Sequence, residues 1–284
     1  MNQLIYKFVS AAVLASVSGL TSAAAVLNDF KVNEAVIDGT GVAGLAENFT
    51  ADKFTGTYVE RFQVTGANTF TTTAFFKVGS FSKDDGANTV SPILLNAFEA
   101  IGGYQLYGIF TASGSFAQSG TTTSFTGANA TFSLYADSNS DSGSGVAFGV
   151  GANNLNVVGT DFGMTDLLLA QSSTLVAGEG SFVPTSLAKG NFAILFGGLD
   201  GNGSPVADGL TALGKGYFYA PSPFYMVART SGQFDTFVLP ALGSTVEFTG
   251  SLDVTFANQI PEPTSLALAG IALAGLGFSR RKVR

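Results

Sequence analysis

The sequence predicts an all-β protein whose core is an antiparallel, jelly-roll-like β-sandwich. One observation is composition: the central part of the chain is rich in Gly, Ser, Thr, Phe and Val, which favour strands and turns over helices. Another is pattern: many short stretches alternate apolar with polar residues and are separated by turn residues, as in antiparallel sandwiches. Since no Pro-rich or charged linker interrupts this part, one core domain is expected over residues 26–259.

The clearest pair of strands flanks the short turn at Gly66-Ala67-Asn68. Apolar and polar residues alternate from Tyr58 to Val64 and again from Phe70 to Val78. Two alternating runs joined by a short turn containing Gly and Asn predict a β-hairpin. Asp84-Asp85-Gly86 is a predicted turn for the same reason, because Gly and Asp tolerate turn conformations.

The rest of the core reads as short strands with one helical pattern. Ser91-Pro92 can start a helix, and Gly102-Gly103 can end it. A buried connection between strands is the alternative for this stretch. Further strands are expected at Tyr104–Thr111, Ala130–Ala136, Asn154–Val158, Asp166–Ala170, Phe192–Phe196, Gly216–Tyr219, Phe224–Thr230, Phe234–Val238, Thr245–Thr249 and Ser251–Phe256.

The N-terminus, residues 1–25, predicts a secretory signal helix that is removed after export. Lys7 supplies a positive n-region, and the stretch from Phe8 to Leu20 is apolar and uncharged. Ala23 and Ala25 form a small-residue cleavage site before Val26. A buried N-terminal helix of the folded domain is the disfavoured alternative.

The C-terminal segment, residues 260–284, has three consecutive parts. They are the motif Pro261, Glu262 and Pro263, the uncharged run Thr264–Phe278, and the basic cluster Arg280, Arg281, Lys282 and Arg284. The apolar run predicts a short transmembrane helix, and the basic cluster predicts a stop-transfer signal on the cytoplasmic side. Fifteen helical residues span roughly 22 Å, against roughly 30 Å of hydrocarbon. Such weak insertion favours transient contact with the inner membrane over a permanent anchor, which stays the alternative.

This C-terminal segment resembles the PEP-CTERM sorting signal of Gram-negative bacteria. The motif, the apolar run and the arginines follow one another in the same order, although Ile260 stands where Val is usual. The resemblance implies recognition by an exosortase, a membrane-bound transpeptidase-like cysteine protease, with cleavage near the motif. It also implies delivery through the inner membrane to the cell surface or the exopolysaccharide matrix.

The net charge of the predicted exported part limits the classes of partner that it can bind. Between Asp29 and Glu262 lie 20 acidic and eight basic residues, which gives a net charge of −12. An acidic domain of this kind is a poor binder of nucleic acid. It is a plausible binder of cations, and divalent ions could bridge it to an anionic polysaccharide.

The residue types that are missing exclude several catalytic mechanisms. The chain has no Cys, no His and no Trp. Cys–His and Ser–His–Asp mechanisms are therefore excluded, and so are disulfides. A glycosidase needs two carboxyl groups across a cleft, and sequence spacing selects no such pair among the 20 acids. We expect a protein without catalytic activity.

Two loops carry oxygen ligands at a spacing that suits Ca²⁺. In the first, Asp137, Asn139 and Asp141 lie two residues apart, and in the second Asp200 and Asn202 do. A curled loop could point such side chains at one ion. The first loop departs from the EF-hand pattern, which needs Gly at its sixth position and Glu at its twelfth. Ordinary solvated turns are the favoured alternative for both loops.

Aromatic residues cluster around Pro221 and Pro223. Tyr217-Phe218-Tyr219 and Phe224-Tyr225 could form a platform on which sugar rings stack. Packing in the core is the favoured interpretation, because Phe is the main large apolar residue of this chain.

Four segments of the core are similar to the flocculation-associated group of PEP-CTERM proteins. They are residues 28–34, 49–60, 103–107 and 136–141. This resemblance implies a surface or matrix protein that cells need to aggregate with exopolysaccharide into flocs or biofilm. Two hypotheses follow: a non-catalytic structural or adhesive module that Ca²⁺ could assist, or a lectin or carbohydrate-active enzyme displayed at the surface.

Overall fold

The computed structural model describes residues 27–37, 47–90, 92–97, 103–138, 166–183, 188–195, 198–199, 205–206, 209–220, 227–234 and 239–257. Most of these residues lie in antiparallel strands, so the predicted all-β class is confirmed. The predicted signal peptide and the C-terminal apolar segment lie outside the described residues.

In the described part of the chain, the main sheet has ten strands, of which eight are long. The long strands are β3 (Lys53–Gly66), β4 (Thr69–Lys83), β6 (Gln105–Ser119), β7 (Thr122–Asp137), β9 (Thr174–Phe182), β10 (Ala188–Leu195), β14 (Val227–Phe234) and β15 (Thr245–Ala257). The shorter elements are β1 (Phe30–Asn33), β2 (Asn48–Ala51), β5 (Asn88–Val90), β8 (Leu167–Ser172), β11 (Gly198–Leu199), β12 (Pro205–Val206), β13 (Phe218–Ala220), the 3₁₀ helix η1 (Glu34–Val36) and the helix α2 (Ala212–Tyr217).

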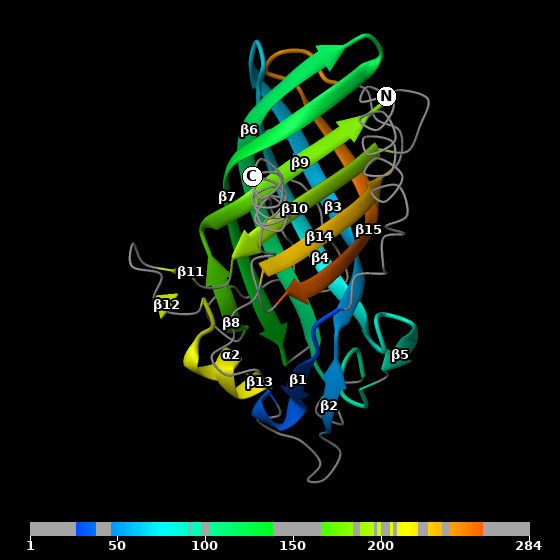
Figure 1. The fold of residues 1–284 in the computed structure, drawn as a ribbon, viewed down its shortest axis with the longest axis vertical. Helices are drawn as coiled ribbons and strands as arrows, with labels where there is room; N and C mark the ends of the chain where they lie inside the picture. The colour runs from blue at the N-terminus through cyan, green and yellow to red at the C-terminus, as the bar shows by residue number, and fades with distance from the viewer. Residues whose placement is uncertain are drawn as a thin grey trace, which may run out of the picture.

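The main sheet closes on itself. Each long strand pairs with the next long strand along the chain, and β3 pairs with both β4 and β15. Figure 1 shows β9, β10, β14 and β15 crossing in front of β3 and β4, so opposite parts of one sheet face each other as the layers of a sandwich do. The long strands follow one another as neighbours in an up-and-down meander. The connections therefore do not cross between sheets as those of a jelly roll do.

Local patterns match the structure well. The predicted hairpin is β3–β4, joined by Ala67 and Asn68. Residues 92–97 are not helical; Leu95 instead forms a parallel bridge with Tyr104, which agrees with the alternative of a buried connection. The two strands expected within residues 245–256 are one continuous strand, β15, whereas β9 was not predicted.

The interior of the closed sheet is filled mainly by phenylalanine. Phe62 and Phe70 stack across the β3–β4 pair with ring centroids 5.1 Å apart, and Phe125 meets both rings edge-on. Phe76 and Phe132 stack at 5.5 Å from different strands. Because inward and outward side chains alternate along each strand, this packing leaves most Thr, Ser and charged residues of the described strands on the outside.

One end of the closed sheet is plugged by the shorter elements. Figure 1 shows β1, β2, β13 and α2 at its foot, where β1 pairs with both β2 and β13. The buried Glu34 accepts a hydrogen bond from the Tyr104 hydroxyl at 3.2 Å, and the hydroxyls of Tyr104 and Tyr217 lie 2.7 Å apart. Burial raises the pKa of Glu34. This polar network joins three distant chain segments inside the plug.

Gly56 lets β3 and β4 approach closely at an irregularity in their pairing. A β-carbon on Gly56 would lie 2.0 Å from the Lys77 carbonyl oxygen, which belongs to the main chain and cannot turn aside. The substitution Gly56→Ala should therefore lower the free energy of unfolding by about 2 kcal/mol. Urea unfolding followed by far-UV circular dichroism measures this effect.

The matched control is Gly79→Ala on the neighbouring strand. A β-carbon on Gly79 would have only one neighbour within 4 Å, the Thr55 carbonyl oxygen at 3.6 Å, which is an ordinary contact. Equal loss of stability in the two variants would contradict a close approach at Gly56.

Candidate functional site

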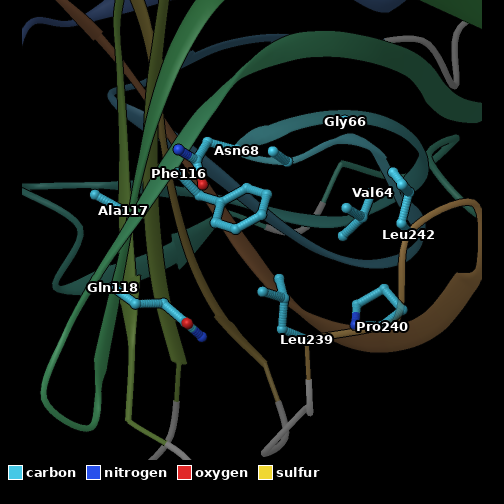
Figure 2. A pocket seen from close by; sticks show the side chains of 10 residues that line it. Val64, Gly66, Asn68, Phe116, Ala117, Gln118, Leu239, Pro240 and Leu242 are labelled. Atoms are coloured by element: carbon cyan, nitrogen blue, oxygen red, sulfur yellow. The ribbon is translucent and has the colours of Figure 1, made fainter.

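A pocket of about 510 Å³ lies at the end of the closed sheet opposite the plug. Three segments that are distant in the sequence form it: the β3–β4 turn, the end of β6, and the chain just before β15. The lining residues are Val64, Gly66, Ala67, Asn68, Phe116, Ala117, Gln118, Leu239, Pro240 and Leu242. Figure 2 shows the Phe116 ring, Val64 and Leu239 around the cavity, with Asn68 and Gln118 beside it.

Hydrogen bonds hold the three segments together. The Phe116 amide donates to the Asn68 carbonyl at 2.9 Å, which ties β6 to the β3–β4 turn. The Gly243 amide donates to the Val64 carbonyl at 2.8 Å, which ties the segment before β15 to the end of β3. Gly243 has a φ of +79°, a conformation that favours glycine. The described walls of the pocket are therefore fixed by the fold.

The pocket combines apolar walls with amide groups. Among the described residues that line it, none carries a charged side chain. Asn68 and Gln118 are exposed, and their side-chain amides make no hydrogen bond within the described part of the chain. Each amide can both donate and accept. This arrangement can hold an uncharged group that has an apolar face and several hydroxyls.

The structure places one of the predicted calcium ligands. Asp137 is fully buried at the end of β7, whereas Asn139, Asp141, Asp200 and Asn202 lie outside the described residues. Within the described ranges, no three acidic side chains are grouped so that they could hold a metal ion. The calcium sites stay a prediction.

Next to Asp137, aromatic rings stack on the outer face of the sheet. Tyr107 lies between Phe75 and Tyr135, with ring centroids 5.3 and 5.2 Å away. The Tyr107 hydroxyl donates to Asp166 at 2.5 Å, and burial followed by this hydrogen bond raises the pKa of Tyr107. Sequence reasoning missed this cluster, because the residues come from three strands and no local spacing links them.

The sequence analysis did not single out Asp52, another buried acid. Asp52 is fully buried, and its Oδ2 accepts a hydrogen bond from the Gly86 amide at 3.0 Å. Its Oδ1 has no hydrogen-bond partner. Burial, and then the carboxylates of Asp29 and Asp85, raise the pKa of Asp52. The predicted turn at residues 84–86 is correct, but the carboxylate that supports it lies 34 residues away.

Glu60 is a carboxyl group on the inward face of the sheet. It lies opposite the buried residues Ala74 and Phe248, and it accepts a hydrogen bond from the Thr72 hydroxyl. Burial raises the pKa of Glu60 to about 7. In the sequence it lies between Tyr58 and Phe62 on the apolar face of the strand, a signal that the sequence analysis did not use.

Two of the three described residues of the predicted aromatic platform belong to the core. Tyr217 and Phe218 are buried, as the core interpretation predicted, and Tyr219 is 42% exposed. Phe224 and Tyr225 lie outside the described residues.

Comparison with known families identifies the C-terminal segment. Residues 259–282 match the PEP-CTERM protein-sorting motif. This chain carries the PEP-CTERM sorting motif. No curated protein and no solved structure matches it. The motif implies export, processing by an exosortase, and a place outside the cell for the PEP-CTERM protein.

The matched range contains the predicted motif residues Pro261, Glu262 and Pro263 and most of the basic cluster. The remaining member, Arg284, follows it. The structural positions of these residues, and of Ala23 and Ala25, lie outside the described part of the PEP-CTERM protein. Within the residues that the structure describes, no helix is both long and apolar enough to cross a membrane.

The stability of this PEP-CTERM protein should depend on the charge of Glu60. Because its folded-state pKa is raised from 4.5 to about 7, folding favours the protonated form. Stability that is present below pH 4.5 is then lost as the pH rises through 7, by about 3 kcal/mol, since one pKa unit corresponds to about 1.36 kcal/mol. Glu60→Gln should remove this loss, as measured by urea unfolding over that pH range.

Glu247→Gln is the control, because Glu247 is an exposed acid that pairs with Arg61 on the outer face. It should leave the pH dependence in place. If Glu60→Gln and the wild type lose the same stability over this range, Glu60 does not titrate as described.

Proposed function

We propose that this PEP-CTERM protein is a non-catalytic structural or adhesive component of the exopolysaccharide matrix, acting in flocculation or biofilm formation. The observation that carries the proposal is the sorting motif at residues 259–282, which directs the core outside the cell. The acidic charge of the core supports a role in contacts bridged by cations rather than in binding nucleic acid.

The closed sheet supports a role as a displayed module. Each of the eight long strands has a partner on both sides, so the sheet itself offers little free edge for adding strands from other chains. Its outer face carries rows of hydroxyl groups; Thr73, Thr111 and Thr131, for example, lie opposite one another on adjacent strands. A hydroxyl-rich, hydrated surface suits multiple weak contacts with a polysaccharide.

Calcium is part of the proposal. The two loops at Asp137, Asn139 and Asp141 and at Asp200 and Asn202 offer oxygen ligands, the type that Ca²⁺ prefers. An ion held by the protein and by an anionic polysaccharide would link the two despite their like charges.

A lectin is the second candidate, and the pocket at the end of the closed sheet opposite the plug favours it. The pocket is concave, uncharged and fixed by main-chain hydrogen bonds. These properties suit recognition of a defined small group. A carbohydrate-active enzyme would need, in addition, a pair of carboxyl groups across this cleft.

Deleting residues 260–284 should redirect the protein. Without the motif and the basic cluster, an exosortase has nothing to recognise, so the truncated chain should be lost from the cell surface and cells should aggregate less. Fractionation and a sedimentation assay measure the two effects. The double substitution Pro261→Ala and Pro263→Ala should act like the deletion, whereas Val283→Ala is the control. Normal display and flocculation by the truncated protein would refute the sorting role.

Calcium should raise the melting temperature of the purified exported protein. Saturation to 100 times the dissociation constant adds about 2.7 kcal/mol to stability. Asp137→Asn combined with Asp200→Asn should abolish the calcium-dependent increment, whatever it does to the baseline. The control is Glu179→Gln, an exposed acid on β9. A melting temperature that is independent of calcium in the wild type would contradict the cation part of the proposal.

A further inference from the structure

We propose that the pocket formed by the β3–β4 turn, the end of β6 and the segment before β15 binds one neutral sugar unit of a glycan. This inference rests on the proposed function, which places the protein among polysaccharides. It adds a binding site and a class of ligand that the sorting motif does not specify.

The charge of the pocket selects the class of ligand. None of the ten lining residues that the structure describes is Asp, Glu, Lys or Arg. A charged ligand would lose its hydration on entering the pocket, and no opposite charge would compensate for that loss. The acidic core adds a repulsion against anionic ligands. An uncharged ligand has neither cost.

The shape and the apolar atoms of the pocket suit a pyranose ring. The Phe116 ring, Val64 and Leu239 surround the cavity, and Pro240 and Leu242 extend the same wall (Figure 2). A pyranose has a face of C–H groups that can pack against such a surface, as apolar faces do against aromatic rings. The volume of about 510 Å³ lies in the range of small-molecule sites.

The polar atoms beside the cavity match sugar hydroxyls. A hydroxyl both donates and accepts, and so does the carboxamide of Asn68 or Gln118. Neither side chain makes a hydrogen bond within the described residues, and both are exposed. A hydrocarbon chain in the pocket would cover these amides without replacing their bonds to water, which disfavours an aliphatic ligand.

The pocket is prepared for binding. The amide of Phe116 is bonded to the turn at Asn68, and Gly243 is bonded to Val64. The Gln63 side chain also donates to the Gly243 carbonyl at 3.3 Å. Since these bonds already fix the walls, a ligand orders little of the described main chain when it binds.

The test titrates the exported protein with glucose, galactose, mannose and short neutral oligosaccharides, using glucuronate and hexanoate as competing ligand classes. Saturation-transfer NMR and calorimetry report binding. We expect at least one neutral saccharide to bind, and glucuronate and hexanoate to bind more weakly. Gln118→Ala combined with Asn68→Ala should weaken binding about tenfold, since each lost hydrogen bond contributes modestly.

The control variant is Gln171→Ala, which removes an exposed amide on β8, outside the pocket lining. Its binding should equal that of the wild type, and matching melting temperatures would show that all variants are folded. A second variant, Gln118→Glu, keeps the size of the side chain but adds a charge, and it should also weaken binding.

The proposal is overturned if no neutral saccharide binds, if glucuronate or hexanoate binds more tightly, or if the pocket variants bind as the wild type does. Display and cell aggregation, measured on the same pocket variants, separate this result from the proposed function. Loss of sugar binding with normal display supports the pocket and leaves the sorting role intact. Failure of the tail deletion to alter display refutes the sorting role without bearing on the pocket.

Discussion

The fold depends on the pairing of β3 with two partners, the next long strand β4 and the last strand β15. The β3–β15 ladder runs over eleven residue pairs, from Thr245 opposite Gln63 to Thr255 opposite Lys53. Without it, the sheet would be open, with two long free edges and an uncovered face of phenylalanine side chains. Closure instead gives each long strand two neighbours and creates one interior with two ends, of which one is plugged and the other carries the pocket.

The buried carboxyl groups of Glu34, Glu60 and Asp52 each have a hydrogen-bond donor beside them. Glu34 sits among the hydroxyl of Tyr104 and the amide of Glu47, and Glu60 meets the hydroxyl of Thr72. In both groups burial raises the pKa, so the charged forms are the less favoured ones. Asp52 differs, because one of its buried oxygens has no hydrogen-bond partner. The polar interior of this protein is therefore a source of pH dependence as well as of specificity.

The sequence was most informative about features that depend on residues close together in the chain. Alternation over a few residues predicted the β3–β4 hairpin, and the linear order of motif, apolar run and basic residues predicted the sorting signal. Closure could not be predicted, because Arg61 and Glu247 are 186 residues apart and either strand alone looks the same in an open sheet. The pocket was missed for the same reason, since Val64, Phe116 and Leu239 meet only after closure. Residues 92–97 show the limit of helical periodicity, because buried apolar residues there serve a connection between strands.

The direction of β15 determines the pole of the domain at which the described chain ends. The strand starts at Thr245, beside the pocket, and its last pairs with β3 lie next to Lys53, near the plug. Thirteen residues at about 3.3 Å each make a strand of roughly 43 Å. Leu27, where the described chain begins, is likewise bonded to Asp85 near the plug. Both ends of the described domain thus lie at one pole, so the chain continues toward its C-terminal sorting motif from the pole opposite the pocket.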